Sequence, residues 1–447
     1  MNKTETVENK LTDLKKTLAY YETFSCVQCG YCLPACPTYQ TMGKETHSPR
    51  GRINLVKMTA EGKLTNLNLL ADSIDKCLGC RACETACPTG VRYGKIYESA
   101  KSLLHLREEE SSPSKGWKNI LLHSVIPNKK RLNRLANFVW FYQKSGLQKI
   151  ARHSGFLRLL PNHLGEFEAL LPTLPSPVER AKRPVRFPAQ GKPKYRVAFF
   201  TGCVMDAIFE KINRLSMQLL QKAGCEVVMI EGETCCGALH AHTGDLETAK
   251  QLAKQNITAF EQAANREPLD FIVNNAGGCG AMLIEYDHLF RGDPEWEPRA
   301  RTFVEKTRDI SQVLTMTGPL PIVKQTNQKK EVVTYQRSCH MTNVQKVTKE
   351  PLQLIRSIPG IELREMENPD KCCGSAGIYN IVNYNESMDI LDDKMSTVKN
   401  TGATTIITTN PGCLLQMKMG IIREGLQDKV RAVHLVELLA EACGIEI

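Results

Sequence analysis

The chain of 447 residues has no uninterrupted apolar run close to the roughly 18 residues that a membrane span requires. Its first residues, MNKTETVENKLTDLKK, are polar and unlike a signal peptide. We therefore expect a cytoplasmic protein that is at most peripheral to the inner face of the cell membrane. Because thiols stay reduced in that compartment, the 18 cysteines are expected to serve as metal ligands rather than disulfides.

The sequence also lacks the Gly-x-Gly-x-x-Gly fingerprint of dinucleotide-binding proteins. The nearest candidate is the run Gly277-Gly278-Cys279-Gly280, which has the wrong spacing and a cysteine at its centre. We interpret this run as a metal-cluster loop, and we expect any flavin to be bound by another chain.

Acidic residues are missing from the segment 111–165. It contains ten basic residues: Lys115, Lys118, Lys129, Lys130, Arg131, Arg134, Lys144, Lys149, Arg152 and Arg158. The basic residues elsewhere balance the 48 acidic ones, so the whole surplus of +10 lies in this segment. Its aromatic residues are Trp117, Phe138, Trp140, Phe141, Tyr142 and Phe156.

Such a basic and aromatic segment suits contact with an anionic membrane surface, a quinone or an acidic partner subunit. An equally weighted alternative is a solvated helical linker whose apolar stripe packs on the next domain. Nucleic acid is the least favoured ligand, because no recognised nucleic-acid module accompanies the charge.

Two cysteine runs dominate the first hundred residues. Each has three cysteines two residues apart and a fourth that precedes a proline: Cys26, Cys29, Cys32 and Cys36, and then Cys77, Cys80, Cys83 and Cys87. This is the spacing with which bacterial ferredoxins hold a pair of [4Fe–4S] clusters. Zinc ribbons and disulfide frameworks are less favoured, because zinc sites use pairs of Cys-x-x-Cys.

In the ferredoxin pattern the fourth cysteine of each run reaches the other cluster. The first cluster is therefore assigned to Cys26, Cys29, Cys32 and Cys87. The second is assigned to Cys77, Cys80, Cys83 and Cys36. A helix carrying Leu11, Leu14, Leu18 and Tyr21 on one face is expected to precede the first run.

The second half of the chain has a different texture. A proline-rich stretch, 171–194, is expected to be an extended and exposed linker. From Tyr195 onward, short strand-like runs alternate with helical patterns, which favours α/β structure. The expected strands cover 196–200, 226–230, 271–274, 332–336 and 404–409.

These α/β patterns occur twice, each with four cysteines in the same order. The first copy contains Cys203, Cys235, Cys236 and Cys279, and the second contains Cys339, Cys372, Cys373 and Cys413. The spacings are 32 and 33 residues to the cysteine pair, then 43 and 40 to the last cysteine. The two copies also close similarly, at Asp309 and at His434. We interpret this as an internal duplication that gives two similar domains.

The repeated cysteines follow predicted strands, at the sheet edge where α/β domains bind ligands. Each pair precedes a glycine, which permits a tight loop around a metal centre. We predict one or two further iron–sulfur sites; the alternative, a strained disulfide within each pair, is rare in the cytoplasm.

The Cys…Cys-Cys-Gly…Cys pattern resembles the cysteine-rich domains of the heterodisulfide reductase family. Complete members carry a fifth cysteine in a final Cys-x-x-Cys, whereas this sequence has Met282 and Gln416 at those positions. The resemblance therefore implies ordinary four-thiolate clusters at least as well as the unusual cluster of that family.

The order of two ferredoxin motifs, a basic bridge and two cysteine-rich repeats resembles the iron–sulfur subunits of bacterial glycolate oxidases. The run 46–53, Thr-His-Ser-Pro-Arg-Gly-Arg-Ile, is also typical of that family. The resemblance implies a subunit that carries electrons from an FAD-binding partner, which oxidises glycolate to glyoxylate, toward a quinone or another acceptor. It implies that the hydroxy acid is oxidised on the partner and that this chain contributes no catalytic residue.

Other functions remain open. Relatives with the same layout serve lactate or glycerol 3-phosphate oxidation. The repeats could also form a catalytic disulfide or quinone reductase site, or the chain could be a redox-sensing module that binds a membrane or nucleic acid. His240, His242 and His340 flank cluster cysteines and are candidate proton relays, although supporting histidines are the favoured reading. Cys225 and Cys443 are expected to be core residues.

The expected fold is α+β and multidomain: a helical two-cluster ferredoxin-like domain followed by two duplicated α/β cysteine-rich domains. The expected boundaries are 1–105 for the ferredoxin-like domain, 106–194 for the basic segment and linker, 195–320 for the first repeat, and 328–447 for the second.

Overall fold

The computed structural model describes residues 13–111, 120–155, 157, 163–323 and 330–445. The chain divides into two compact units. Unit 1 combines Met1–Gly116 with Leu239–Leu246 and Asp370–Lys394. Unit 2 contains Trp117–Ala238, Glu247–Pro369 and Met395–Ile447. Short segments of both cysteine-rich repeats thus belong to unit 1.

Unit 1 is helical in its described residues. Its elements from the first part of the chain are η1 (Tyr20–Ser25), α2 (Pro37–Met42), η2 (Glu45–His47), α3 (Pro49–Ala60), α4 (Leu67–Asp75), α5 (Ala82–Thr85) and α6 (Tyr93–Ser111). The later segments contribute residues of α14 (Ala238–Thr243), α22 (Tyr379–Val382) and α23 (Tyr384–Thr401). Its buried core includes Leu18, Val56, Leu70, Ile74 and Ile96. Burying this apolar surface fixes the helices that carry the cluster loops.

The helix expected before the first cysteine run is partly confirmed. Leu11 lies outside the described residues, whereas Leu14 packs against the core and Leu18 is fully buried. Tyr21 does not continue this apolar face, because its side chain is 75% exposed. The helical register changes before it: Ala19 adopts a left-handed conformation with φ of 46°, and the 3-10 turn η1 follows.

The basic segment and the linker of unit 2 contain η3 (Ile120–Val125), α8 (Lys129–Lys144), α9 (Leu147–His153), α10 (Leu164–Ala169), α11 (Pro177–Ala181) and β1 (Arg186–Phe187). The prediction of an extended, exposed linker over 171–194 is therefore wrong in part. Ser176 begins α11 with a capping box to Glu179, and β1 pairs antiparallel with β3. Leu174 and Phe187 are buried, so apolar contacts hold this proline-rich stretch on the domain.

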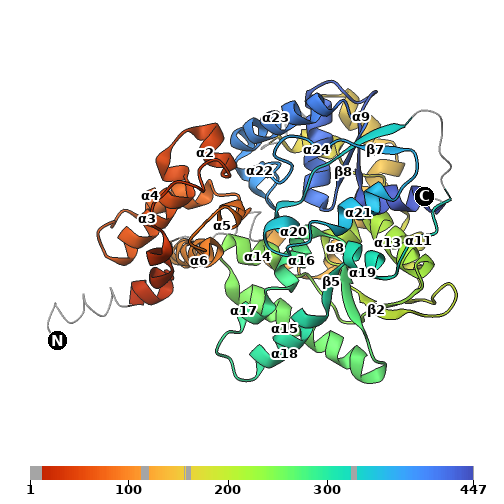
Figure 1. Ribbon diagram of the computed structural model, residues 1–447, viewed down its shortest axis with the longest axis horizontal. Helices are drawn as coiled ribbons and strands as arrows, with labels where there is room; N and C mark the ends of the chain where they lie inside the picture. Colours follow the sequence, from red (N-terminus) through yellow and green to blue (C-terminus); the bar gives the residue numbers. More distant parts are fainter. Residues whose placement is uncertain (1–12, 112–119, 156, 158–162, 324–329, 446–447) are drawn as a thin grey trace. The chain divides into compact units, whose positions relative to one another are not determined.

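The first repeat contains β2 (Tyr195–Phe199), β3 (Cys225–Met229), β4 (Phe271–Asn274) and β5 (Thr307–Asp309). With β1 they form a five-stranded sheet in the order β1-β3-β2-β4-β5, and all pairings among β2 to β5 are parallel. Its helices are α12 (Val204–Ala207), α13 (Glu210–Lys222), α15 (Leu246–Arg266), α16 (Gly277–Leu283), α17 (Tyr286–Leu289), α18 (Trp296–Lys306) and α19 (Ile310–Met316). Figure 1 shows these helices in green around the sheet.

The second repeat contains β6 (Glu331–Tyr335), β7 (Ile361–Leu363), β8 (Thr405–Thr408) and β9 (Arg431–His434). They form a parallel sheet in the order β7-β6-β8-β9. Its helices are α20 (Cys339–Asn343), α21 (Glu350–Arg356), α24 (Pro411–Arg423) and α25 (Leu435–Ala442), in addition to α22 and α23. The order matches β3-β2-β4-β5 of the first repeat, so the predicted duplication is present in the fold.

The five strands expected from sequence correspond, within one residue at each end, to β2, β3, β4, β6 and β8. Strands β5, β7 and β9 were not predicted. Each has three or four residues, and β9 begins with the exposed Arg431. Such short segments pair only because the neighbouring central strand offers a partner, which local sequence does not reveal.

The ends of both repeats are built alike. Asp309 caps α19 and His434 caps α25, and each forms a capping box with the third helical residue. Both caps are buried, which raises the pKa of Asp309 to about 6 and lowers that of His434 to about 4. The two residues therefore give the fold opposite dependences on pH.

We predict that His434→Asn reduces the acid sensitivity of unit 2. The folded pKa of His434 is depressed from 6.5, so its contribution to stability is present above pH 6.5 and is lost as pH falls toward 4. Asparagine keeps the cap without a proton to bind. Thermal unfolding should show a smaller loss, by up to a few kcal/mol, between these pH values.

Asp309→Asn is the matched control, and its effect should have the opposite sign. The folded pKa of Asp309 is raised from 3.8, so its contribution falls as pH rises toward 6. Equal pH profiles for wild type and His434→Asn would contradict the assignment.

Candidate iron–sulfur sites

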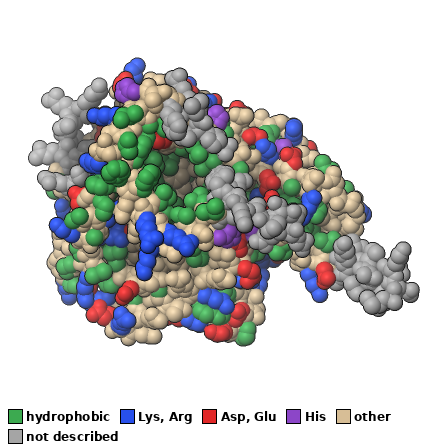
Figure 2. Space-filling view, turned by 180° about the vertical axis from the view of Figure 1, so that it is seen from behind, with side chains coloured by type: hydrophobic (Ala, Val, Ile, Leu, Met, Phe, Trp, Pro, Cys, Tyr) green, Lys and Arg blue, Asp and Glu red, His purple; other side chains and the backbone are tan. Residues whose placement is uncertain are grey.

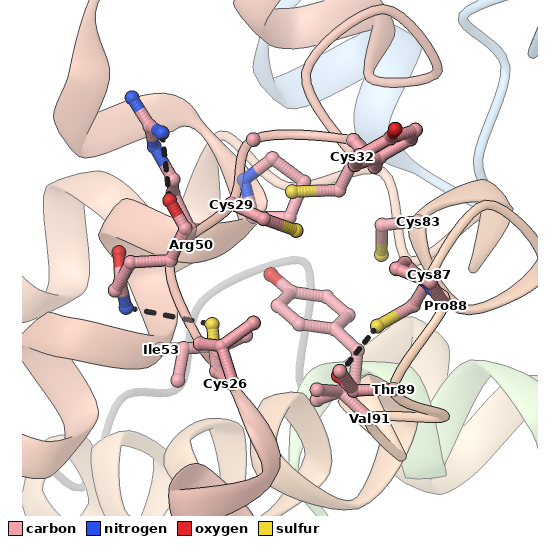
Figure 3. Close-up of a pocket in the computed structure, with 16 residues that line it drawn as sticks. Cys26, Cys29, Cys32, Arg50, Ile53, Cys83, Cys87, Pro88, Thr89 and Val91 are labelled. Carbon is pink, nitrogen blue, oxygen red and sulfur yellow. Dashed lines mark hydrogen bonds between the residues drawn. The ribbon is translucent and has the colours of Figure 1, made fainter.

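The first ferredoxin run and the end of the second line one pocket (Figure 3). Cys26, Cys29, Cys32 and Cys87, the four residues assigned to the first cluster, all line it, together with Cys83. Cys29 is exposed, and the other three are partly buried. The structure thus brings this predicted ligand set together at the surface of unit 1.

Hydrogen bonds prepare the Cys87 thiol of this pocket to carry charge, whereas burial raises the pKa of Cys32. The Thr89 hydroxyl lies 3.3 Å from Cys87 Sγ and donates to the Ser25 carbonyl, which joins the two runs. Burial would raise the pKa of Cys87, but its hydrogen bonds with the Thr89 side chain and with the backbone of residues 89–91 outweigh burial and lower the pKa. Gln28 Nε2 donates to Cys26 Sγ over 3.4 Å. Donors aimed at sulfur favour the thiolate, the form that binds iron.

A second pocket contains the other predicted set. Cys36, Cys77, Cys80 and Cys83 line it, and Cys36 and Cys83 are buried. Pro49, Cys83 and Tyr93 line both pockets, so the two sites share walls. Burial raises the pKa of the Cys83 thiol well above its usual value, so positive charge is needed to keep the thiolate.

The run 46–53 holds both cysteine loops. Ser48 caps α3 by accepting the Gly51 amide at 3.0 Å, and Pro49 occupies the first turn. A Cβ on Gly51 would lie 2.0 Å from the Glu45 carbonyl oxygen, so only glycine fits. Arg50 donates to Glu45 at 2.6 Å and to the Gln28 carbonyl at 3.0 Å, which ties α3 to the first cysteine loop.

Arg52 lies beside the second pocket and is 1% exposed. It donates to the Ser73 carbonyl at 2.8 Å and to Thr38 Oγ1 at 3.1 Å, and its Nη1 lies 3.9 Å from Cys36 Sγ. Burial alone would lower the pKa of Arg52, but the charges of Cys77, Tyr93 and Cys36 outweigh it and raise the pKa. Arg52 is therefore a permanent positive charge at the thiolates. Sequence analysis assigned no individual role to Arg52, because an arginine 16 residues from a cysteine contacts it only through tertiary packing.

Unit 1 also contains one cysteine pair of the second repeat, Cys372 and Cys373, both buried. The segment after this pair is attached to the second ferredoxin run. Lys76, the residue before Cys77, binds Asn383 Oδ1 at 3.1 Å and forms an ion pair with Glu386. Tyr379 donates to the Lys76 carbonyl at 3.4 Å, and Asn383 donates to the Asp75 carbonyl at 3.3 Å.

A buried lysine accompanies the same pair. Lys394 is 1% exposed, and burial lowers its pKa to about 8, against the opposing effect of the Cys373 and Cys372 charges. A second cation inside unit 1 thus compensates thiolate charge, as Arg52 does at the ferredoxin pocket.

The four cysteines of the first repeat belong to unit 2 and lie together. Cys203 follows β2, Cys235 and Cys236 follow β3, and Cys279 lies in the first turn of α16 after β4. Cys203 Sγ lies 3.3 Å from Cys235 Sγ, and the thiol of Cys236 is hydrogen-bonded to those of Cys235 and Cys279. The pKa of Cys203 is raised by its hydrogen bond to Cys235 and by burial. Cys203, Cys235 and Cys236 are buried and Cys279 is partly buried, so the four thiols can ionise together only around a cation, which fits an iron–sulfur cluster.

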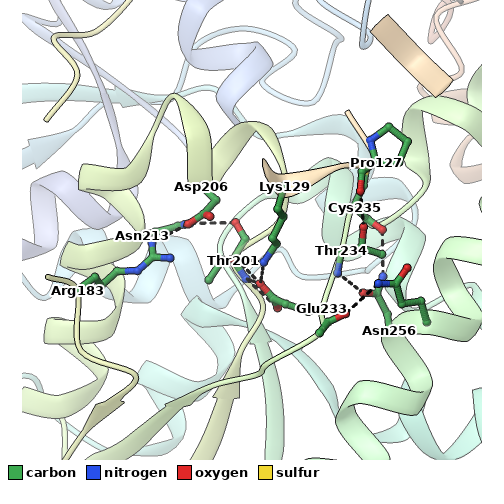
Figure 4. Close-up of polar contacts among 12 residues, drawn as sticks. Pro127, Lys129, Arg183, Thr201, Asp206, Asn213, Glu233, Thr234, Cys235 and Asn256 are labelled. Carbon is green, nitrogen blue, oxygen red and sulfur yellow. Dashed lines mark hydrogen bonds and ion pairs between the residues drawn. The ribbon is translucent and has the colours of Figure 1, made fainter. Parts of the chain in front are cut away.

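A buried carboxylate fixes two of the cysteine loops (Figure 4). Glu233 accepts from the Thr201 amide at 3.1 Å and from the Thr201 hydroxyl, and Lys129 Nζ lies 2.7 Å from it. Thr201 precedes Cys203, and Glu233 precedes Cys235. Burial raises the pKa of Glu233, and the charge of Lys129 opposes that rise. Lys129 comes from the basic segment, so that segment takes part in holding the first-repeat site.

Behind the cysteine pair, amide and phenol groups satisfy the loop backbone. Asn256 accepts from the Thr234 amide at 2.7 Å and donates to the Cys235 carbonyl at 3.0 Å. Tyr286, fully buried, donates to the Cys236 carbonyl at 2.9 Å. These hydrogen bonds hold the loop of the Cys235–Cys236 pair in one conformation.

Glycines let the two repeats approach at the Cys279 loop. The Gly277 amide donates to the Thr409 carbonyl, and the Gly278 amide donates to Asn410 Oδ1 at 2.9 Å. A Cβ on Gly277 would lie 2.4 Å from Ser338 Oγ. The run 277–280 is thus glycine-rich because another loop packs on it, and Asn410 also donates to Cys413 Sγ at 3.7 Å.

Cys339 begins α20 and Cys413 lies in the first turn of α24, both in unit 2. Their predicted co-ligands Cys372 and Cys373 are in unit 1. The assignment of all four to one cluster therefore stays a prediction.

The remaining candidates are placed as follows. His240 is buried in α14, and His340 lies in α20 next to Cys339. Met282 and Gln416, at the positions of the absent fifth cysteines, are buried. Cys225 and Cys443 are fully buried, in β3 and after α25, which agrees with a core role.

The fold and these sites define an iron–sulfur protein with a two-cluster ferredoxin-like domain and a duplicated cysteine-rich domain. Residues 22–91 match the 4Fe-4S dicluster domain family, and residues 197–284 and 333–418 match the cysteine-rich domain family. Residues 113–171 match the linker region of the glycolate oxidase iron–sulfur subunit.

Curated relatives identify the family. A probable glycolate oxidase iron–sulfur subunit of Bacillus subtilis is 49% identical over 97% of this chain and 96% of its own. The glycolate oxidase iron–sulfur subunit of Escherichia coli is 28% identical over 87% of this chain and 88% of its own. Lactate utilization protein A of Geobacillus kaustophilus is 33% identical over 55% of this chain and 98% of its own. The chain belongs to the family of glycolate oxidase iron–sulfur subunits and is a subunit of an oxidoreductase complex.

We predict that Arg52→Gln lowers the reduction potential of the cluster beside Cys36 by tens of millivolts. Reduction adds negative charge, and the buried guanidinium favours it. Redox titration followed by EPR should show the shift, and Lys63→Gln, an exposed change in the same unit, should leave the potential unaltered. An unchanged potential with full iron content would refute the electrostatic role of Arg52.

We predict that Lys129→Met destabilises unit 2 by about 3–5 kcal/mol, because it leaves the buried Glu233 carboxylate without its cation. The double variant with Glu233→Gln should recover part of the loss. Lys250→Met, which breaks the exposed pair with Glu247, should cost less than about 1 kcal/mol. Thermal unfolding of wild type, of these three variants and of Glu233→Gln alone measures the coupling between Lys129 and Glu233, and additive losses in the double variant would rule it out.

Proposed function

We propose that this chain carries electrons from an FAD-binding partner, which oxidises glycolate to glyoxylate, toward a quinone or another acceptor. The named relatives support glycolate as the substrate of the complex. The proposed ligands are the eight ferredoxin cysteines for two [4Fe–4S] clusters, with one or two further clusters at the cysteine-rich repeats. When bound, such clusters accept and release single electrons.

The observation that carries this proposal is the continuity of cysteine sites in unit 1. The two ferredoxin pockets share Cys83, and the Cys372–Cys373 segment is joined to Lys76, beside Cys77. Electron transfer requires closely spaced centres in fixed positions. Arg52 and Lys394 supply buried positive charge where added electrons would place negative charge.

The residues of this chain would hold the clusters in fixed positions and tune their reduction potentials. Gln28 and the backbone amides of residues 89–91 direct hydrogen bonds at sulfur atoms of the exposed pocket. Glu233 and Asn256 keep the first-repeat loops in place. No residue is assigned to oxidation of the hydroxy acid, which we place on the partner.

The basic segment is the proposed contact with a quinone or a membrane surface. In its described part, Phe138, Phe141 and Ile150 are more than half exposed on α8 and α9. Figure 2 shows a face on which Lys and Arg side chains lie next to hydrophobic ones. No helix among the described residues is long and apolar enough to cross a membrane. We propose a cytoplasmic location with peripheral membrane contact, a mode that salt would weaken.

Lactate is the second candidate substrate of the partner, because lactate utilization protein A is among the relatives. Glycerol 3-phosphate dehydrogenation, or a disulfide or quinone reductase site in the repeats, would require the same electron-carrying sites.

We predict about twelve to sixteen irons per chain after anaerobic purification, four for each cluster. The double variant Cys236→Ala/Cys373→Ala should lose the irons of the repeats and keep about eight. Iron and acid-labile sulfide analysis with EPR of the reduced protein measures both. About eight irons in wild type, unchanged in the variant, would confine the clusters to the ferredoxin-like domain and contradict the longer route.

The matched control is Cys225→Ala, a buried cysteine outside every motif, which should keep the wild-type iron content. Coexpression with a candidate FAD subunit tests the substrate: glycolate, rather than lactate, should reduce the clusters of the complex. If lactate reduces the clusters and glycolate does not, the substrate of the partner is lactate and the glycolate proposal is wrong.

A further inference from the structure

Four apolar side chains lie close together in sequence at the first cysteine run of unit 1, and each is more than half exposed. Tyr21 and Phe24 belong to η1, and Val27 and Tyr31 belong to the loop that carries Cys29. We call these four residues the 21–31 patch. Exposed apolar residues are ordinary when they are scattered, but four of them in one short stretch mark a surface that contacts another molecule.

The patch borders the first cluster pocket, which Figure 3 shows. Val27 and Tyr31 line this pocket together with its cysteines, and Cys29 is the exposed member of the eight ferredoxin cysteines. In the second pocket, by contrast, Cys36 and Arg52 are buried. The first cluster site is therefore the one that a second protein can approach.

Tyr20 holds the aromatic part of the patch in place. Its ring packs edge-to-face on Tyr21 and on Phe24, with ring centroids 5.5 and 5.0 Å apart. Its hydroxyl donates to Glu61 at 3.0 Å, at the end of α3. Aromatic residues are enriched at protein interfaces, and rings that are already held in place lose little conformational freedom on binding. The patch therefore suits a preformed contact with another protein.

The charged groups around the rings favour an acidic partner. The carboxylates of Glu22 and Glu61 are each already engaged in ion pairs. Lys15 and Lys57 place their ammonium groups over two rings of η1, at 5.3 and 4.7 Å from the ring centroids. Within the described part of the chain, neither lysine forms an ion pair. Carboxylates on a partner would supply the missing countercharge and speed the encounter.

We propose that the 21–31 patch is the docking surface for the FAD-binding partner, and that electrons enter this chain at the first cluster. This inference rests on the proposed function, in which the acceptor contacts the basic segment of unit 2. The second pocket is joined to the Cys372–Cys373 segment through Lys76, so it lies inside the route. The exposed first pocket is then the end of the route that is left for the donor.

The electrons balance at this surface. Oxidation of reduced FAD to FAD on the partner releases two electrons and two protons. The electrons cross the patch one at a time, because each cluster accepts a single electron, and the protons leave to solvent on the side of the partner.

The first test needs no variant, so misfolding cannot hide the answer. Hydrogen–deuterium exchange of the cluster-loaded full chain is compared with and without the coexpressed FAD-binding subunit, and the amides of residues 20–32 should be protected in the complex. Unprotected amides in a complex whose clusters glycolate reduces would overturn the docking surface and leave the proposed function standing. Protection in a complex that passes no electrons to the clusters would refute the proposed function alone.

The second test measures affinity for the same subunit. Tyr21→Ser/Phe24→Ser should weaken binding at least about tenfold, as loss of aromatic anchors does, and should keep the iron content and EPR spectrum of wild type. Leu69→Ser, an equally exposed apolar residue on α4, is the matched control and should bind like wild type. Lys57→Gln should lower the association rate and its dependence on salt.

Four results of the second test would each overturn the proposal. They are wild-type affinity of the double variant, an equal loss of affinity with Leu69→Ser, an unchanged association rate with Lys57→Gln, and a double variant that loses vesicle binding or self-association but keeps the partner. The last result would assign the patch to a membrane or to a second copy of this chain.

Discussion

The charge of gathered thiolates is the constraint on which the rest of this structure depends. Thiolates repel one another and lose hydration when they are buried, so they stay ionised only beside cations or hydrogen-bond donors. The chain meets this need locally at three places: Arg52 lies beside Cys36, Lys394 accompanies the Cys372–Cys373 pair, and the backbone of residues 89–91 is hydrogen-bonded to Cys87. Iron supplies the remaining positive charge.

Buried polar residues hold the cysteine loops in place. Glu233 joins the loops that carry Cys203 and Cys235. Asn256 accepts a hydrogen bond from the Thr234 amide and donates one to the Cys235 carbonyl. Glycines at 277 and 278 allow a second loop to hydrogen-bond directly to the backbone beside Cys279. Polar groups at these positions reduce the apolar core, but they define one geometry for the loops, which an apolar contact would not.

Much of this organisation could be read from the sequence, because ligand spacing is a local property. The ferredoxin spacing predicted which cysteines line each pocket, and the structure places all eight there. The internal repeat predicted two similar α/β domains, and strands β2, β3, β4, β6 and β8 were predicted from their apolar runs. Strands β5, β7 and β9, and the helix and strand within 171–194, were missed, because they are stabilised by neighbours distant in sequence.

Spacing and composition along the chain predict the cysteines that would hold clusters, the number of similar domains and the segment where positive charge is concentrated. Which cations and carboxylates serve those cysteines follows from tertiary packing alone. Arg52 reaches Cys36 across 16 residues, Lys129 reaches Glu233 across 104, and Lys76 reaches Glu386 across 310. Spacing along the chain can specify ligands of one loop, whereas a buried ion pair forms wherever packing brings opposite charges together.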